Sequence, residues 1–267
     1  MRPVVLIANP ASGGGKVLRL LPGVEGRLTE LGVSFRTQLT RSLEHARELA
    51  VQAAAEGAIA TSFSGDGVAG AVAGALAGTD AIVGVLPGGT GNDFCRHVGI
   101  PKDPLAACHV LVHGIPTPID LGEADGRPFL GIASTGFDSS ANEIANEAPR
   151  WLGRGIYVYG ALAALARWKA AEFTVELDGV GRTFEGWSVI VANTSVYGAG
   201  MYVAPDARLD DGLLDVVTIS CSSRLRFAST LPQVFKGTHI GEVYDRMKDA
   251  VLDELLGPVV FDLAVLQ

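Results

Sequence analysis

Short apolar runs alternate with amphipathic stretches along the first part of the chain. The runs have the length and the β-branched content of buried strands, and they cover Val4–Ala8, Val33–Thr37, Ala58–Phe63 and Ala81–Leu86. Helical spacing of apolar positions predicts helices between them, namely 16–31 with a break at Pro22-Gly23, 42–56, 67–77 and 104–112. Ser42 is a suitable N-cap for the second of these helices. This alternation predicts an α/β domain with a parallel sheet and helices on both faces.

The pattern changes after Gly114. The apolar runs that follow predict strands separated by turns such as Asp178-Gly179, and they cover Phe129–Ala133, Phe173–Leu177, Trp187–Ala192 and Leu213–Ile219. One helical stretch, about 156–169, interrupts them. We therefore predict two domains, an α/β domain over residues 1–118 and a β-rich domain over residues 119–267.

Composition narrows the classes of function. The chain has 267 residues, 48% hydrophobic residues and a formal net charge of −8. A negative charge argues against nucleic acid as a partner, because binding to a phosphate backbone needs a basic face. Three scattered cysteines, Cys95, Cys108 and Cys221, indicate neither a disulfide framework nor a zinc site. With no signal-peptide pattern at the N-terminus, these features favour the cytoplasm.

Three glycine-containing loops follow predicted strands, and they carry the candidate chemistry. They are 9–16 after the first strand, Ser64-Gly65-Asp66-Gly67 after the third, and 87–93 with Gly89, Thr90, Gly91 and Asn92 after the fourth. Glycine-rich loops at helix starts can bind phosphate through backbone N–H groups. Strand exits at one edge of a parallel sheet form a crevice for a nucleotide. The alternative is that the glycines only shape strand-to-helix turns.

These motifs resemble those of the diacylglycerol kinase catalytic domain family, which also includes sphingosine and ceramide kinases and has NAD kinases as distant relatives. Further stretches agree with it in order, Gly136-Phe137-Asp138, 197–201, 204–207 and Asp211-Gly212. The resemblance covers about residues 3–240. It implies an N-terminal α/β nucleotide domain of the NAD-kinase and diacylglycerol-kinase type, followed by a C-terminal β-sandwich domain that accepts the lipid.

The resemblance also implies roles for residues. ATP would be held by Asn9, Pro10, Ala11, Ser12, Gly13, Thr40, Gly65, Asp66, Gly67, Gly89, Thr90 and Asn92. Asp66, Asp93 and Asp138 would be catalytic and would gather Mg²⁺, since clustered carboxylates repel one another without a cation. A structural Mg²⁺ would use Asp211 and the carbonyls of Arg208 and Leu213. Aspartate beside glycine is also an ordinary turn or cap residue, so this alternative stays open for each aspartate.

The sequence departs from the family at three places. Val68 and Ala71 stand where the family has threonine and an acidic residue. The family ends with a strand bearing Asp-Gly-Glu, whose glutamate is the general base, and this chain has no such triplet after Ile240. We read Glu254 as a residue on a helix surface and assign no base. Two functions follow, an ATP-dependent lipid kinase impaired by its C-terminus, or a non-catalytic relative that binds nucleotide or lipid.

The expected partner is a lipid resembling diacylglycerol. Peripheral contact with the inner face of the membrane and a homodimer are both compatible with the sequence. The helical stretch near 156–169 combines aromatic and basic residues, which suits a membrane interface, and these are Trp151, Tyr157, Tyr159, Trp168, Arg150, Arg154, Arg167 and Lys169. We favour the alternative, in which the aromatic side chains belong to the core.

Overall fold

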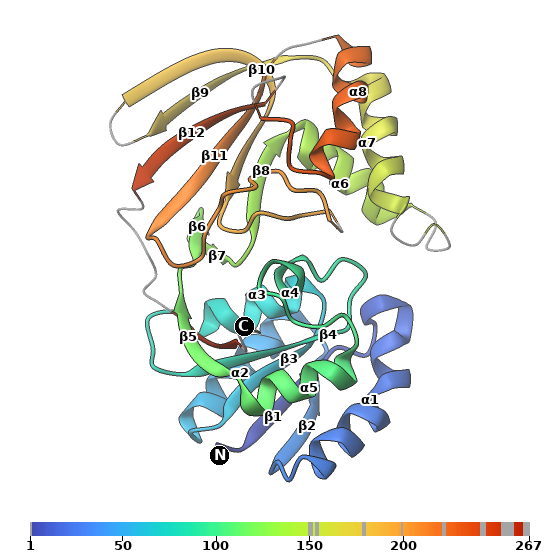
Figure 1. Cartoon of the computed structure of the whole chain (residues 1–267), viewed down its shortest axis with the longest axis vertical. Coiled ribbons are helices and arrows are strands. Elements are labelled where there is room, and N and C mark those ends of the chain that lie inside the picture. Colours follow the sequence, from blue (N-terminus) through green and yellow to red (C-terminus); the bar gives the residue numbers. More distant parts are fainter. Residues whose placement is uncertain are drawn as a thin grey trace. The chain divides into compact units, whose positions relative to one another are not determined.

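The chain forms two compact units that divide between Gly131 and Ile132 (Figure 1). The computed structural model describes residues 2–148, 152, 155–177, 180–198, 200–220, 223–240, 244–251 and 259–263. The last strand, β13 (Val259–Leu263), belongs to the first unit. The sequence places the boundary at 118/119 instead, before the hairpin of β6 (Gly122–Ala124) and β7 (Arg127–Phe129), which the structure assigns to the first unit.

The first unit is built on a six-stranded sheet with the order β2-β1-β3-β4-β13-β5. Its first four strands in sequence are parallel and are β1 (Val4–Ala8), β2 (Phe35–Leu39), β3 (Ile59–Ser64) and β4 (Ile82–Pro87). Strand β13 runs parallel to β4, and the edge strand β5 (Ile115–Ile119) runs antiparallel to β13. An edge position suits β5, because Pro116 and Pro118 cannot donate backbone hydrogen bonds to a second neighbour.

The helices described beside this sheet are α1 (Ser12–Glu30), α2 (Leu43–Ala55), α3 (Asp66–Ala75), α4 (Asp93–His97) and α5 (Pro104–His113). Helix α1 packs against α5, and α2 packs against α3. The predicted α/β architecture is confirmed. The predicted break at Pro22 is wrong, since α1 continues through this residue. Pro22 is exposed, and burial of Val24 and Leu28 in the following turns outweighs one missing backbone bond.

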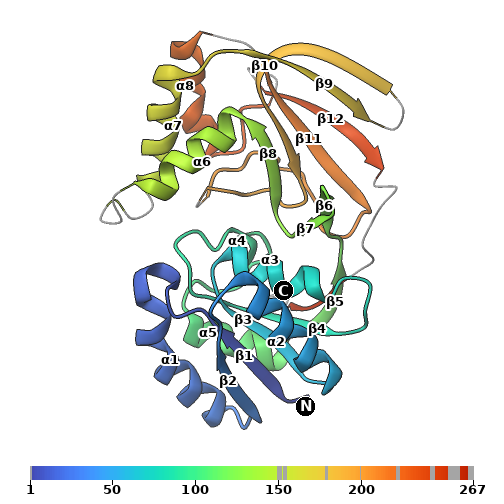
Figure 2. The same cartoon turned by 180° about the vertical axis from the view of Figure 1, so that it is seen from behind.

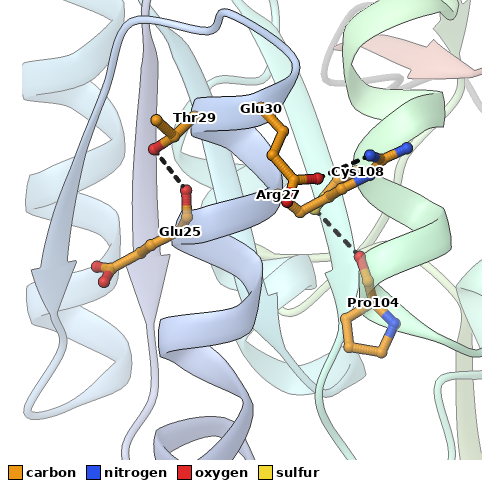
Figure 3. A network of polar contacts seen from close by, with 6 residues as sticks. All are labelled: Glu25, Arg27, Thr29, Glu30, Pro104 and Cys108. Carbon is orange, nitrogen blue, oxygen red and sulfur yellow. Dashed lines mark hydrogen bonds and ion pairs between the residues drawn. The ribbon is translucent and has the colours of Figure 1, made fainter.

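Local hydrogen bonds reinforce α1 and α5 (Figure 3). The Thr29 hydroxyl donates to the Glu25 carbonyl at 2.9 Å, and Arg27 pairs with Glu30 at 2.9 Å. In α5 the buried Cys108 thiol donates to the Pro104 carbonyl at 3.2 Å. Burial raises the pKa of Cys108 to about 11, against the smaller opposing effect of Arg27. This thiol is therefore neutral at physiological pH and serves packing.

In the described part of the second unit, helices lie on one side of a β-sheet (Figures 1 and 2). Its strands are β8 (Ile132–Gly136), β9 (Ala171–Leu177), β10 (Val180–Ala192), β11 (Leu213–Ser220) and β12 (Tyr244–Val251). The order is β12-β11-β10-β8, and β9 pairs with β10. Its helices are α6 (Phe137–Glu147), α7 (Gly155–Arg167) and α8 (Arg224–Val234). The predicted β-rich domain is confirmed, but α6 and α8 were not predicted.

An aromatic cluster forms the core between helices and sheet in the second unit. Phe137 packs edge-on against Trp168 and Phe227, at ring-centroid distances of 5.9 and 5.0 Å. Trp187 completes the cluster. The expectation that the aromatic residues of the helical stretch are core therefore holds for Trp168. It is wrong for Tyr159, which is exposed because it lies on the outer face of α7.

Two predictions near the domain ends need correction. The single predicted strand Phe129–Ala133 is divided, since β7 ends at Phe129 and β8 begins at Ile132. The C-terminal region contains strands, because β12 pairs with β11 and β13 pairs with β4 and β5. Glu254, Trp151 and the turn Asp178-Gly179 lie outside the described residues. None of the described helices is long and apolar enough to cross a membrane.

Candidate functional site

The three glycine loops meet at the carboxyl edge of the first sheet. Strands β1, β3 and β4 are neighbours in the sheet, so the loops that follow them leave the same edge. Backbone bonds join their starting points, because Asn9 donates to the Phe63 carbonyl at 3.3 Å and Gly88 donates to the Ser64 carbonyl at 2.6 Å. Thr40 donates from its backbone to the Ala8 carbonyl at 2.9 Å. Backbone hydrogen bonds therefore hold the starts of these loops together at one edge of the sheet.

Glycines allow the loops to touch backbone to backbone. A Cβ atom at Gly89 would lie 2.5 Å from the Cα of Gly65, and one at Gly13 would lie 2.6 Å from the carbonyl oxygen of Gly88. Any larger residue would push these loops apart. The Ser12 hydroxyl lies 3.9 Å from the Cβ position of Gly65, so the first loop also borders this contact. The glycines thus form a continuous cradle with little side-chain bulk.

The first loop is held by Asn9. Its side-chain oxygen accepts a hydrogen bond from the backbone of Ala11 at 3.0 Å, and its carbonyl accepts one from Ser12 at 3.1 Å. Gly13, Gly14 and Gly15 follow in the left-handed region, with φ angles of 57, 66 and 83°. A run of left-handed residues turns the chain sharply before regular helix begins. Asn9 therefore fixes the shape of this loop through its side chain and its carbonyl group.

The third loop closes on itself through Asn92. The Asn92 side chain accepts from the backbone N–H of Gly89 at 2.8 Å and donates to the Gly89 carbonyl at 2.9 Å. Asn92 has a left-handed φ of 52°. The N–H of Gly89 and the amide of Asn92 are thus used within the loop, which supports its shape. Thr90, at the tip between them, is exposed, so its hydroxyl is accessible to a ligand.

Two carboxylates converge beside the cradle. One oxygen of Asp66 accepts a hydrogen bond from the backbone N–H of Phe94 at 3.0 Å. The Oδ2 atoms of Asp66 and Asp93 lie 3.3 and 3.2 Å from one point, the Cβ position of Gly91. Carboxylate oxygens are ligands that Mg²⁺ prefers, and two carboxylates near one point can share a cation. Asp66 and Asp93 therefore have the chemistry and the placement to hold a magnesium ion together.

Three residues that follow one another in α4 differ in charge beside the carboxylates of Asp66 and Asp93. Arg96 lies one helical turn from Asp93, with 3.7 Å between its Nε and the carboxylate. Burial, together with Asp66 and Asp93, raises the pKa of the Cys95 thiol well above its usual range. Burial lowers the pKa of His97. As a result, Cys95 and His97 are both uncharged at neutral pH. Arg96 is charged, and it lies within ion-pair distance of Asp93.

The remaining residues of the predicted ATP site border the same edge. Pro10 is half-buried, whereas Ala11 and Gly67 are exposed. Thr40 is buried, and its hydroxyl donates to the Ser42 carbonyl at 2.7 Å. Ser42 in turn caps α2 by accepting from His45 at 3.0 Å, as predicted. Thr40 thus takes part in the turn into α2, and only its acceptor capacity remains for a ligand.

The residues that differ from the family's pattern lie within α3. Val68 and Ala71 are both buried apolar side chains. Burial explains why these positions accept apolar residues without leaving an unpaired polar group in the helix. Gly67, which precedes them, has open space around its Cβ position. The second loop therefore keeps its backbone geometry despite the two departures.

The predicted site residues of the second unit lie near the start of α6 and near the start of β11. Asp138 lies in the first turn of α6, directly after Phe137, and its side chain is outside the described part of the structure. Arg208 and Asp211 lie in the loop before β11, and Leu213 is the first residue of that strand. Asp211 accepts a hydrogen bond from the backbone of Leu213 at 3.2 Å, and Arg208 bonds to Asp210. This is the geometry of an Asp-Gly turn, and Asp211 still has oxygen capacity for a cation.

Among the described residues, no group of three or more histidine, cysteine, aspartate or glutamate side chains has the geometry of a metal site. Sequence reasoning missed Phe94, whose N–H orients Asp66, and Arg96. A signal for Arg96 existed, since its spacing of three from Asp93 places the two side chains on one helix face.

Comparison with known proteins agrees with this geometry. The family model described as diacylglycerol kinase catalytic domain matches residues 3–124. A second, described as YegS C-terminal NAD kinase beta sandwich-like domain, matches residues 131–248. A diacylglycerol kinase of Mycobacterium tuberculosis is 36% identical over 246 residues, which cover 89% of this chain and 79% of that protein. The chain belongs to the diacylglycerol kinase family.

Other members of the diacylglycerol kinase family agree over similar lengths. A diacylglycerol kinase of Bacillus subtilis is 29% identical over 249 residues, covering 91% of this chain and 82% of that protein. A crystal structure of a diacylglycerol kinase from Bacillus anthracis has a TM-score of 0.74 at 18% identity and covers 99% of this chain and 98% of its own. This likeness shows the fold. The comparisons give no support to the alternative of a non-catalytic relative.

Proposed function

We propose that this chain is an ATP-dependent lipid kinase that transfers the γ-phosphoryl group to a hydroxyl of diacylglycerol or a related lipid. The names of its relatives support a lipid kinase. One observation supports phosphoryl transfer most directly, the convergence of Asp66 and Asp93 beside a cradle of glycines. Phosphoryl transfer depends on positioning and on neutralising charge, and both requirements suit this arrangement.

The first unit would hold ATP. The glycines of the 9–16 and 64–67 loops would let a phosphate approach the backbone closely, and the start of α3 offers the positive end of a helix dipole. Thr90, at an exposed loop tip, would add a hydroxyl donor. Asn9 and Asn92 would act by fixing their loops, since each bonds to backbone within its own loop.

Asp66 and Asp93 would hold Mg²⁺, which supplies charge neutralisation at the phosphates when bound. The hydrogen bond from Phe94 fixes one oxygen of Asp66, and the other lies near the Cβ position of Gly91, as does Oδ2 of Asp93. The Nε atom of Arg96 lies 3.7 Å from Oδ1 of Asp93. Asp138 remains a proposed third carboxylate, and Asp211 with the carbonyls of Arg208 and Leu213 a proposed structural Mg²⁺ site.

The second unit would accept the lipid, and the enzyme would work at the inner face of the membrane.

The general base remains to be assigned. The segment that joins β12 to β13 carries Asp253 and Glu254 next to each other, without the glycine that separates such residues in the family's triplet. We propose that this difference slows transfer, because a positioned base contributes roughly 10²–10⁴-fold.

The test is transfer of labelled phosphate from ATP to a panel of lipids, with diacylglycerol, monoacylglycerol, sphingosine and ceramide as acceptors. We expect a labelled phospholipid product from one acceptor, abolished by chelation of Mg²⁺. Calorimetric titration with Mg–ATP should show binding in the absence of lipid. Binding without transfer to any acceptor would favour the non-catalytic alternative, and absence of binding would remove the three-loop site.

A further inference from the structure

Two exposed histidines lie one helical turn apart on α5. His109 and His113 are four positions apart, which places both side chains on one face of the helix. Their ring centroids are 4.3 Å apart, and the rings are tilted by 45°. Both residues are exposed, whereas Cys108 and Leu111 are buried on the inner side of α5. The pair therefore presents two neighbouring imidazoles at the surface of the first unit.

The other three histidines of the chain are held in different ways. The Nδ1 atom of His45 accepts a hydrogen bond at 3.2 Å from the backbone just before α2. His97 is half-buried in α4, and burial lowers its pKa. His239 is fully buried, with its Nε2 atom 3.2 Å from a backbone carbonyl oxygen. Among the five histidines, all of which the structure describes, His109 and His113 are the two that are exposed and stacked on each other.

The two imidazoles have the chemistry and the spacing of metal ligands. Imidazole nitrogen binds zinc, copper and nickel ions, and two histidines at i and i+4 of a helix can bind the same ion. Two nitrogens on a tetrahedral Zn²⁺ lie roughly 3.4 Å apart, since each Zn–N distance is about 2.0–2.1 Å. Rings with centroids 4.3 Å apart can reach this separation by rotation of their exposed side chains. Water would complete the coordination.

The place of the pair at the end of α5 also favours a cation. Helix α5 ends at His113, and its last carbonyl groups carry the negative end of the helix dipole. The exposed Lys102 precedes the opposite end of this helix. On α1, which packs against α5, the charge of Arg27 is offset by Glu30 at 2.9 Å (Figure 3). The helix dipole therefore attracts a metal ion to the end of α5 that carries the histidines.

We propose that His109 and His113 form a binding site for a divalent transition-metal ion, with Zn²⁺ as the expected ion. The site differs in chemistry from the proposed Mg²⁺ sites, because imidazole suits Zn²⁺ and carboxylate oxygens suit Mg²⁺. The ion would join two successive turns of α5 and so stabilise the end of the helix that leads into the edge strand β5. This binding does not depend on phosphoryl transfer, so the site stands whether or not the chain is a kinase.

Calorimetric titration of the full chain with Zn²⁺ at about pH 8 tests the site, because neutral imidazole is the form that binds metal. Excess Mg²⁺ in the buffer occupies carboxylate sites. His109→Asn or His113→Asn should each weaken Zn²⁺ binding by about tenfold or more, because the second ligand on the same helix acts at a high effective concentration. Asparagine has nearly the helix propensity of histidine, so α5 should persist, and circular dichroism checks this.

The variant with both substitutions separates chelation from two independent histidines. If one ion needs both rings, each single variant should already lose most of the affinity that the double variant loses. If the two rings bound metal separately, each single variant would keep wild-type affinity at half the stoichiometry. That result would overturn the proposal.

His45→Asn is the matched control, because His45 is a lone histidine near the start of a helix. It should bind Zn²⁺ as wild type does, and so should Cys221→Ser, which tests a thiolate as the alternative ligand. Zn²⁺ should raise the melting temperature of wild type and of both controls, but not of the α5 variants.

Equal affinity of His45→Asn and His109→Asn, or loss of binding in Cys221→Ser, would overturn the site. Sedimentation velocity with Zn²⁺ adds an independent measurement. A dimer that forms only with Zn²⁺ and needs both histidines would support the site, with a second pair completing the coordination.

Discussion

The carboxylate of Asp66 accepts a hydrogen bond from the backbone N–H of Phe94 at 3.0 Å, across 28 positions of sequence. This bond joins the start of α3 to the start of α4. It leaves the second oxygen of Asp66 directed towards the same point as Asp93. The contact therefore has two consequences, since it fixes the loop after β4 and orients a carboxylate for a cation.

Asp66→Asn tests that second consequence. The asparagine oxygen can still accept from Phe94, so the fold and melting temperature should change little. Loss of the negative charge should lower turnover by roughly 10²–10³-fold, as for other groups that stabilise developing charge. Asp80→Asn is the matched control, because Asp80 is exposed before β4, at the opposite edge of the sheet. Turnover in Asp66→Asn at the level of Asp80→Asn would remove Asp66 from the mechanism.

Gly89→Ala tests the cradle. Its new Cβ would lie 2.5 Å from the Cα of Gly65, so the two loops must separate. We expect a loss of about 1–3 kcal/mol in the free energy of unfolding, as for other overpacked sites, and at least roughly tenfold weaker ATP binding by calorimetry.

The control for this change is Gly26→Ala on α1. Gly26 is exposed and has nothing within 4 Å of its Cβ position. Alanine in a helix should stabilise by about 0.5–1 kcal/mol relative to glycine. ATP binding should be as in wild type. Equal ATP affinity in both variants would show that the loops do not need the close contact.

Asp211→Ala tests the proposed structural cation site. If Asp211 holds Mg²⁺, added Mg²⁺ should stabilise the wild type and raise its melting temperature. At a Mg²⁺ concentration of ten times Kd, the free energy of unfolding should increase by about 1.4 kcal/mol. The variant should lose this response. Asp210→Ala should keep it, since Asp210 forms only an exposed ion pair with Arg208. An identical Mg²⁺ response in the two variants would reduce Asp211 to a residue that caps the Leu213 N–H.

Insertion of one glycine between Asp253 and Glu254 tests the impaired C-terminus. Replacing the whole tail is unsuitable, because β12 and β13 are paired strands of the two sheets. The insertion creates the family's Asp-Gly-Glu triplet and should raise turnover by about tenfold, a conservative part of a base effect. Insertion of alanine at the same place is the control for length. Robust wild-type turnover that Glu254→Gln abolishes would instead show that Glu254 is already the base.

Local patterns in the sequence determined the α/β class of the first unit. Apolar runs and helical spacing located β1, β3, β4 and α2, including the Ser42 cap. The glycine loops could be recognised because their backbone requirements restrict the residue type at each position. The convergence of Asp66 and Asp93 was expected only by resemblance, since no spacing places residues from two loops at 3.2 and 3.3 Å from one point.

Contacts between distant parts of the chain were decided by the tertiary structure alone. Strand β13 inserts between β4 and β5, and nothing in its own residues specifies those neighbours. The aromatic side chains of the helical stretch 156–169 were expected in the core, yet in α7 Tyr159 is exposed while Leu165 is buried. Periodicity reports which residues share a face, because it depends on local geometry. Which partner covers that face depends on the rest of the fold.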